Sequence, residues 1–223
     1  AFTVPGRHYE FNVLPFGLCN APATFQRLMN LLLADLQWDK CLVYLDDILI
    51  FSQTFDEHLE RLNLVFTKIK QAGLKLRKEK CNFVQPQTNY LGYVISRKGI
   101  EPDPKKIESV KTFPKPTDVT KVKSFLGLCS YYRRFIRNFA QIAEPLNSLL
   151  KKNTRFIWLQ VHETAFNELK QALSEATLLV YPNYNLPFLL QTDASGQGIA
   201  AILAQEIDGQ EFPVAFASRA LRD

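Results

Sequence analysis

Two short apolar runs separated by only two acidic residues constrain the fold of this chain most. Residues 42–45 and 48–51 consist of aliphatic and aromatic side chains, and Asp46 and Asp47 stand between them. Each run has the length and composition of a β-strand, and two intervening residues suffice only for a tight turn. We therefore predict an antiparallel hairpin with both carboxylates at its tip.

Adjacent carboxylates between apolar strands indicate a cation site. Asp46 and Asp47 are costly to bury side by side unless a cation neutralises them. Carboxylate oxygens are hard ligands that suit Mg²⁺, and a pair of Mg²⁺ ions supports phosphoryl transfer. The alternative is a solvated hairpin tip without a metal, because aspartate is common in turns. For an isolated Asp-Asp pair, that alternative is the more frequent one.

Alternating strand and helix signals surround the hairpin. Residues 11–16 are typical of a strand that ends in a Pro-Phe-Gly turn, and a helix follows with Asn20 as its N-cap and an apolar face. After the hairpin, Thr54 and Glu57 form a potential capping box for a helix that Gly73 closes. Further strands are expected at 74–76 and 90–95. The predicted apolar face of the first helix comprises Phe25, Leu28, Met29, Leu32, Leu33 and Leu36.

The second half changes character. Residues 102–116 are rich in proline and lysine, which predicts a linker with at most a short helix. Helical periodicity resumes and then gives way to strands, with Asp208-Gly209 as the turn between the last two. The helices are predicted at 120–137, 142–150 and 161–174, and the strands at 188–192, 199–205 and 212–217.

The composition is that of a folded protein. Apolar residues make up 47% of the 223 residues and charged residues 22%, which excludes a disordered chain. The net charge of +5 permits a polyanionic partner without requiring one. The four cysteines lack zinc-ligand spacing and are predicted to be reduced, mostly buried thiols of an intracellular protein. No signal peptide or membrane span is predicted, and both ends are expected to be cuts through a longer protein.

Several motifs in order resemble those of one family. Tyr44-Leu45-Asp46-Asp47 resembles the Y-x-D-D box of reverse transcriptases, and residues 14–26 resemble the preceding motif in its gypsy-type form. Four further matches follow in the family's order, so the resemblance covers most of the chain and is specific. They are residues 73–81 (next palm motif), 90–96 (primer grip), 125–136 (thumb and connection) and 192–195 (first ribonuclease H strand).

This resemblance implies a place within the Pol polyprotein of a gypsy-type (Metaviridae) long-terminal-repeat retrotransposon. The expected fold is α+β, with a reverse transcriptase palm made of an antiparallel sheet backed by helices, a helical thumb, a connection and a truncated ribonuclease H-like sheet. The expected domains are residues 1–96 for the C-terminal part of the palm without the fingers, 97–176 for thumb and connection, and 177–223 for the start of ribonuclease H.

The resemblance also implies roles for individual residues. Asp46 and Asp47 would be two of three polymerase carboxylates, and Asp193 the first of four ribonuclease H carboxylates; all three would be catalytic metal ligands. A second group would contact the substrates. Pro15, Phe16, Gly17 and Tyr44 would line the nucleotide pocket, and Gly92 and Tyr93 would lie under the primer terminus. Retroviral enzymes often have Gln where this chain has Phe16, which puts polar contacts to the nucleotide in doubt.

The implied chemistry is RNA-directed DNA polymerisation with an attached ribonuclease H. Each active site would use two Mg²⁺ ions, for which Mn²⁺ can substitute. The partners would be an RNA or DNA template-primer, an RNA–DNA hybrid, deoxynucleoside triphosphates and the rest of the Pol polyprotein, with no membrane. The location would be intracellular, either cytoplasmic in a virus-like particle or nuclear.

Both implied active sites are incomplete in this chain. The third polymerase carboxylate would precede residues 6–11, and three ribonuclease H carboxylates would follow Asp223, so the fragment is expected to be inactive.

Other interpretations stay open for several residues. A turn-capping role for Asp193 is an equal alternative. The basic residues between Lys75 and Lys80 contact a phosphate backbone or form a solvated face. A catalytically silent remnant that binds nucleic acid or a partner is the alternative for the whole chain. Tyr132, Phe135 and Phe139 are predicted to be core, which leaves the neighbouring arginines to solvent or to the template.

Overall fold

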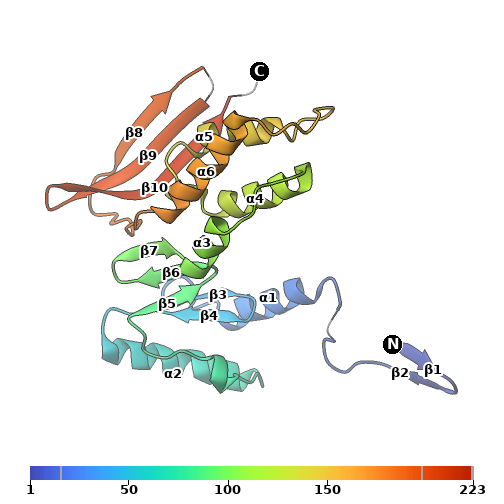
Figure 1. Cartoon of the computed structure of the whole chain (residues 1–223). Helices are drawn as coiled ribbons and strands as arrows, with labels where there is room; N and C mark the ends of the chain where they lie inside the picture. Colours follow the sequence, from blue (N-terminus) through green and yellow to red (C-terminus); the bar gives the residue numbers. More distant parts are fainter. Residues whose placement is uncertain (16, 197, 222–223) are drawn as a thin grey trace. The chain divides into compact units, whose positions relative to one another are not determined.

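The computed structural model describes residues 1–15, 17–196 and 198–221 (Figure 1). The chain forms two compact units, Ala1–Gln85 and Pro86–Asp223. Both combine helices with antiparallel strands, which confirms the predicted α+β class. The finer division into palm, thumb with connection, and ribonuclease H stays a prediction.

Short hairpins and two helices make up the described part of the first unit. Strand β1 pairs with β2, and β3 pairs with β4, in both cases antiparallel. The elements are β1 (Phe2–Val4), β2 (Arg7–Tyr9), α1 (Ala21–Leu32), β3 (Cys41–Tyr44), β4 (Asp47–Ile50), α2 (Phe55–Gln71) and the 3₁₀ turn η1 (Lys78–Lys80).

The core of this unit lies between α1, α2 and the β3–β4 hairpin. Met29, Leu33 and Val65 are almost fully buried, because helix positions three and four apart share one face. Leu28 is 43% exposed, so its predicted place on the apolar face of α1 was wrong. Asn20 starts the helix as predicted, but its side chain makes no capping hydrogen bond.

Two predicted strands of the first unit were wrong. Residues 11–15 and 74–76 lie outside the strands that the structure describes. A short apolar run becomes a strand only when a partner supplies the ladder hydrogen bonds, which composition cannot reveal.

The capping box of α2 differs from the predicted one. Thr54 accepts from the Glu57 amide as predicted, whereas the Glu57 carboxylate accepts from the amide of Gln53.

The second unit contains two three-stranded antiparallel sheets and the remaining helices. The sheet orders are β5-β6-β7 and β10-β9-β8. The elements are β5 (Gln87–Tyr90), β6 (Tyr93–Ser96), β7 (Gly99–Pro102), α3 (Pro104–Lys111), α4 (Val119–Tyr131), the 3₁₀ turn η2 (Arg133–Phe135), α5 (Phe139–Ser148), α6 (Gln160–Ser174), β8 (Leu189–Ala194), β9 (Gly198–Ile207) and β10 (Gln210–Ala220).

The segment predicted as one strand at 90–95 is instead a hairpin. Tyr90 pairs with Tyr93, so the chain reverses at Leu91 and Gly92 between β5 and β6. The prediction was wrong because an apolar residue occupies the first turn position, where sequence patterns lead one to expect Gly, Asn or Asp. The predicted turn at Asp208 and Gly209 is confirmed, and both residues have positive φ.

One large core joins the helices of the second unit. Phe125 of α4, Leu146 of α5 and Leu169 of α6 are completely buried in it. Replacing such a side chain by alanine typically costs about 2–5 kcal/mol, because a cavity remains. Helix α5 packs against β10 (Figure 1). Tyr132, Phe135 and Phe139 are buried in the same core, which confirms their prediction as packing residues.

The described cysteines are free thiols. Cys41 and Cys129 are buried, Cys81 is half-buried and Cys19 is exposed. Burial raises the pKa of the Cys129 thiol to about 12, which keeps it protonated and unreactive. Among the described helices, none combines the length and apolar character needed to cross a membrane.

Candidate functional site

The predicted hairpin around the two aspartates is present. Strands β3 and β4 pair antiparallel, and Tyr44 lies opposite Asp47. The two-residue turn therefore consists of Leu45 and Asp46, and Asp47 is the first residue of β4 rather than part of the tip. Tyr44 and both aspartates are exposed. The hairpin thus presents two adjacent carboxylates to solvent.

Gln26 of α1 holds the backbone of this turn. Leu45 has φ +53°, a left-handed conformation that a branched side chain rarely adopts. Its amide donates to Oε1 of Gln26 over 2.5 Å, and Nε2 of Gln26 donates to the Val43 carbonyl over 3.4 Å. Strained residues of this kind persist only where their surroundings fix them. Gln26 is such a fixing group.

Arg61 of α2 holds the opposite end of the same hairpin. Its Nη1 donates to the carbonyls of Asp39, before β3, and Phe51, after β4, over 2.8 and 2.7 Å. Its Nη2 forms an ion pair with Glu57. The planar guanidinium supplies donors in a fixed fork, which allows one side chain to bridge two chain segments. Both ends of the hairpin are therefore tied to helices.

The residues present can form part of a metal site. Asp46 and Asp47 offer hard oxygen donors on an exposed turn, the donor type that Mg²⁺ prefers. Within the described part of the chain, no group of three or more potential His, Cys, Asp or Glu ligands is assembled. The two carboxylates thus fit a site whose further ligands come from elsewhere.

The predicted nucleotide-pocket residues lie in the same unit, before α1. Pro15 is half-buried, and Gly17 is exposed in a turn with φ +88°. This positive φ is a conformation for which glycine is suited. Phe16 lies outside the described residues. This segment leads into α1, and Gln26 of α1 contacts the backbone of the β3–β4 hairpin.

The predicted primer-grip residues lie in the second unit on the β5–β6 hairpin. Gly92 is in its turn with φ +77°, and Tyr93 opens β6. The Tyr93 ring is half-buried and stacks on Tyr131, with centroids 5.3 Å apart. Burial, together with the neighbouring Tyr131 hydroxyl, raises the pKa of Tyr93 to about 12. The Tyr93 side chain therefore packs against other aromatic rings.

Asp193 lies on β8, in the other sheet of the second unit. It is exposed and pairs with Ala200 of β9. The predicted residues that the structure describes thus form four groups: Pro15 and Gly17 before α1, the β3–β4 hairpin, the β5–β6 hairpin, and Asp193 on β8.

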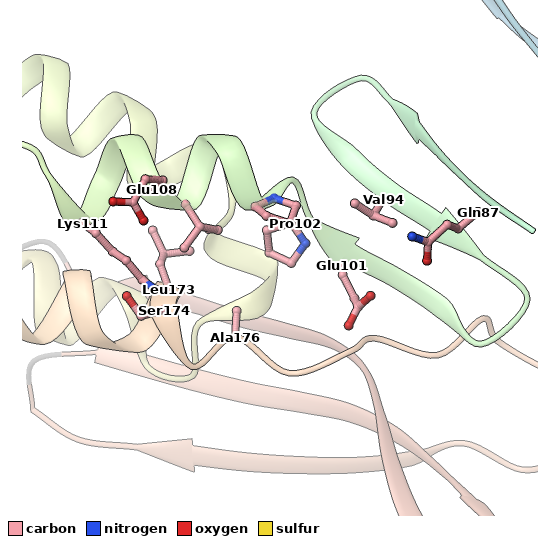
Figure 2. A pocket seen from close by; sticks show the side chains of 11 residues that line it. Gln87, Val94, Glu101, Pro102, Glu108, Lys111, Leu173, Ser174 and Ala176 are labelled. Carbon is pink, nitrogen blue, oxygen red and sulfur yellow. The ribbon is translucent and has the colours of Figure 1, made fainter. Parts of the chain in front are cut away.

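An open pocket of about 420 Å³ lies in the second unit (Figure 2). Its walls come from the β5–β7 sheet, α3 and the end of α6, with Gln87, Glu101 and Lys111 among its polar residues. None of the predicted site residues lines it. The carboxylates of the β3–β4 hairpin are exposed to solvent instead.

Sequence reasoning missed Gln26 and Arg61 as functional residues. A signal for Gln26 existed, because it is three residues before Met29 and seven before Leu33, both buried on α1. A polar residue on an apolar helix face needs a hydrogen-bonding partner when it is covered. For Arg61 no such signal exists, since it bonds to backbone carbonyls that any sequence carries.

Two known families match parts of this chain. Residues 1–95 match the reverse transcriptase (RNA-dependent DNA polymerase) family, and residues 158–223 match the RNase H-like domain found in reverse transcriptase. The retrovirus-related Pol polyprotein from transposon 297 of Drosophila melanogaster is 44% identical over all of this chain, and that from transposon gypsy 39%. The Tf2-3 polyprotein of Schizosaccharomyces pombe is 36% identical over 98% of the chain. The chain spans 21%, 22% and 16% of these three relatives.

Solved structures give the same assignment. A foamy viral protease-reverse transcriptase in complex with double-stranded DNA matches 94% of this chain, and 37% of its own, with a TM-score of 0.83 and 27% identity. The same kind of protein in complex with an RNA/DNA hybrid matches with a TM-score of 0.77, over 94% of this chain and 28% of its own. The chain therefore belongs to the reverse transcriptase and RNase H-like region of retrotransposon Pol polyproteins.

Proposed function

We propose that this chain is the part of a retrotransposon reverse transcriptase that carries two polymerase carboxylates, the primer grip and the first strand of an attached ribonuclease H. In the intact parent, a primer 3′-hydroxyl would attack a deoxynucleoside triphosphate under the direction of a template. The observation that carries this proposal is the pair Asp46 and Asp47, exposed at a turn whose backbone Gln26 holds.

Asp46 and Asp47 would bind divalent cations at this turn, and Asp193 would do so in the ribonuclease H site. Two Mg²⁺ ions per site, which Mn²⁺ can replace, would activate the attacking oxygen and stabilise the leaving oxygen. The contribution of the chain is orientation. Gln26 and Arg61 keep the hairpin backbone in one conformation, so the carboxylates need little rearrangement during the reaction.

The proposed partners are a template-primer duplex, an RNA–DNA hybrid and deoxynucleoside triphosphates. The net charge of +5 and the exposed side chains of Lys75, Arg77, Lys78 and Lys80 support a polyanionic partner. Similarity to foamy viral enzymes bound to double-stranded DNA and to an RNA/DNA hybrid supports the same class. We also propose the remaining polyprotein as a partner. An intracellular location is supported by the free thiols.

Paired substitutions in the full-length parent enzyme test both proposed active sites. Asp46→Asn should slow primer extension roughly 1,000-fold and leave template-primer affinity within about 2-fold, because the metal acts mainly on the transition state. Asp193→Asn should stop RNA cleavage in a hybrid and leave extension unchanged. Extension and cleavage rates are measured on one labelled hybrid.

Asp208→Asn is the matched control, since Asp208 is also an exposed aspartate in a two-residue hairpin turn. It should change neither rate. Near-normal extension by the Asp46 variant would refute the polymerase assignment. Loss of both activities in the Asp193 variant would make that residue structural. A wild-type parent that extends no primer would support the alternative of a silent remnant.

A further inference from the structure

The turn between β5 and β6 has an unusual backbone. Leu91 has φ +50° and Gly92 φ +77°, so both central residues are left-handed, as a type I′ turn requires. Gly92 adopts this conformation without steric cost. Leu91 does not, because its Cβ approaches a neighbouring carbonyl in the left-handed region. Some other contact must therefore hold Leu91 in place.

Two consecutive tyrosines supply that contact. The hydroxyl of Tyr131 donates to the Leu91 carbonyl over 2.5 Å, and the hydroxyl of Tyr132 donates to the Gly92 carbonyl over 2.8 Å. Each bond connects residues 40 positions apart. The amide of Asp103 also donates to the Gly92 carbonyl, over 3.0 Å. Both carbonyls of the turn are thus occupied by donors from distant segments.

The tyrosines are themselves fixed by the core and by Tyr93. Tyr131 ends α4 and is 50% exposed, whereas Tyr132 is 2% exposed. Tyr93 stacks on Tyr131 and meets Tyr132 edge-on, with centroids 5.6 Å apart. A Cβ added to Gly92 would lie 3.1 Å from the Tyr132 hydroxyl, so the turn and the rings are closely fitted. This arrangement couples α4 directly to the turn.

We propose that Tyr131 and Tyr132 are positioning residues that hold the primer-grip turn at Leu91 and Gly92 in its strained conformation through their hydroxyl groups. The inference rests on the proposed function, which puts Gly92 and Tyr93 under the primer terminus. A turn that relaxed would displace the primer 3′-hydroxyl from its line of attack. A displacement of about 1 Å in such a geometry costs roughly 100-fold in rate.

The test uses Tyr131→Phe and Tyr132→Phe in the full-length parent enzyme, since phenylalanine keeps the ring and removes the hydroxyl. Each variant should lower the single-turnover extension rate at saturating nucleotide about 10- to 100-fold. The nucleotide KM, the template-primer Kd and the rate of RNA cleavage should stay within about 2-fold of the wild type, because the contacts to these substrates are intact. The melting temperature is measured in parallel, and Tyr131→Phe carries the test if Tyr132→Phe does not fold.

Tyr181→Phe is the matched control. The Tyr181 hydroxyl donates to the Gly99 carbonyl over 3.3 Å, so this variant loses the same kind of bond at the far end of the same sheet. It should leave the extension rate unchanged. Leu91→Asn provides the rescue, because Asn followed by Gly is favoured in type I′ turns. Combined with Tyr131→Phe, it should restore at least half of the lost rate on a logarithmic scale.

Two results would overturn the proposal. One is extension by both tyrosine variants at the rate of Tyr181→Phe. The other is a loss that Leu91→Asn does not relieve, which would mean that the hydroxyls act through general stability. Either result leaves the proposed polymerase function standing as long as Asp46→Asn is inactive. Normal extension by Asp46→Asn would instead refute the function itself.

Discussion

The two hairpins β3–β4 and β5–β6 end in turns of the same length, and each has a leucine with positive φ at the first turn position. They differ in what holds that leucine. In the β3–β4 hairpin, the Gln26 side chain accepts from the Leu45 amide. In the β5–β6 hairpin, the Tyr131 hydroxyl donates to the Leu91 carbonyl. The left-handed leucine is therefore held through its amide in one hairpin and through its carbonyl in the other.

The two turns also differ in the groups that they carry, which are side-chain carboxylates in one and a glycine backbone in the other. The β3–β4 turn presents side-chain carboxylates, and its backbone is supported from α1 by the amide side chain of Gln26. The β5–β6 turn carries glycine at its second position, where the proposed function would bring the backbone close to the primer. Both carbonyls of this turn accept from tyrosine hydroxyls.

Gly92→Ala should produce the largest loss of stability in this comparison. Alanine pays the left-handed conformational cost and also meets the Tyr132 hydroxyl, so we expect the free energy of unfolding to fall by about 2 kcal/mol. Gly209→Ala is the matched control, because Gly209 has the same φ of +77° in the β9–β10 turn and a Cβ added there would meet no atom within 4 Å. Urea unfolding of both variants separates the contact from the backbone cost. Equal losses would show that the contact with the Tyr132 hydroxyl adds no cost at Gly92.

Gln26→Leu should have a smaller effect on stability in the first unit. It removes the acceptor for the Leu45 amide, and the loss of one such hydrogen bond costs about 1 kcal/mol. Primer extension by the parent enzyme should fall about 10-fold as the carboxylates lose their fixed orientation. Gln26→Glu keeps an acceptor and should lie between this variant and the wild type. Gln71→Leu, an exposed glutamine at the end of α2, serves as the control. An unchanged rate in Gln26→Leu would contradict a positioning role.

The smallest effect is expected at high pH. Burial, and then the proximity of Tyr131, Tyr93 and Asp103, raises the pKa of Tyr132 to about 12 from its usual 10.0. Because the folded-state pKa is the higher one, the protonated hydroxyl contributes stability fully below pH 10. That contribution is lost as the pH rises towards 12. The β3–β4 turn is held by an amide, which does not titrate, and should show no matching loss.

Tyrosinate absorbance during an alkaline titration measures this difference. Tyr132→Phe should remove one of the late-titrating tyrosines. A Tyr132 variant that loses an early-titrating group would contradict the burial of this hydroxyl.

The local elements of the chain were largely predictable from its sequence. Helices α2, α5 and α6 lie within a residue or a few of their expected bounds, because their apolar periodicity and caps are local signals. The β3–β4 hairpin and the turn at Asp208 and Gly209 were predictable for the same reason. The two adjacent aspartates were identified as a candidate metal site from their setting between strands together with the resemblance of the surrounding motifs to those of reverse transcriptases. Their role as metal ligands, like that of Asp193, stays a prediction.

Contacts between distant segments decided the rest. Residues 74–76 have strand composition yet lack a ladder among the described strands, whereas residues 87–90 lack an apolar pattern yet form β5 against β6. Four side chains form hydrogen bonds with distant backbone groups: Gln26, Arg61, Tyr131 and Tyr132. Because every residue carries the same backbone groups, the sequence does not indicate which of them such a side chain will contact. The sequence thus specifies which residues carry charge and which segments are helical. Only the folded chain brings a hydroxyl within reach of a carbonyl 40 residues away, because that distance depends on the packing of every element between them.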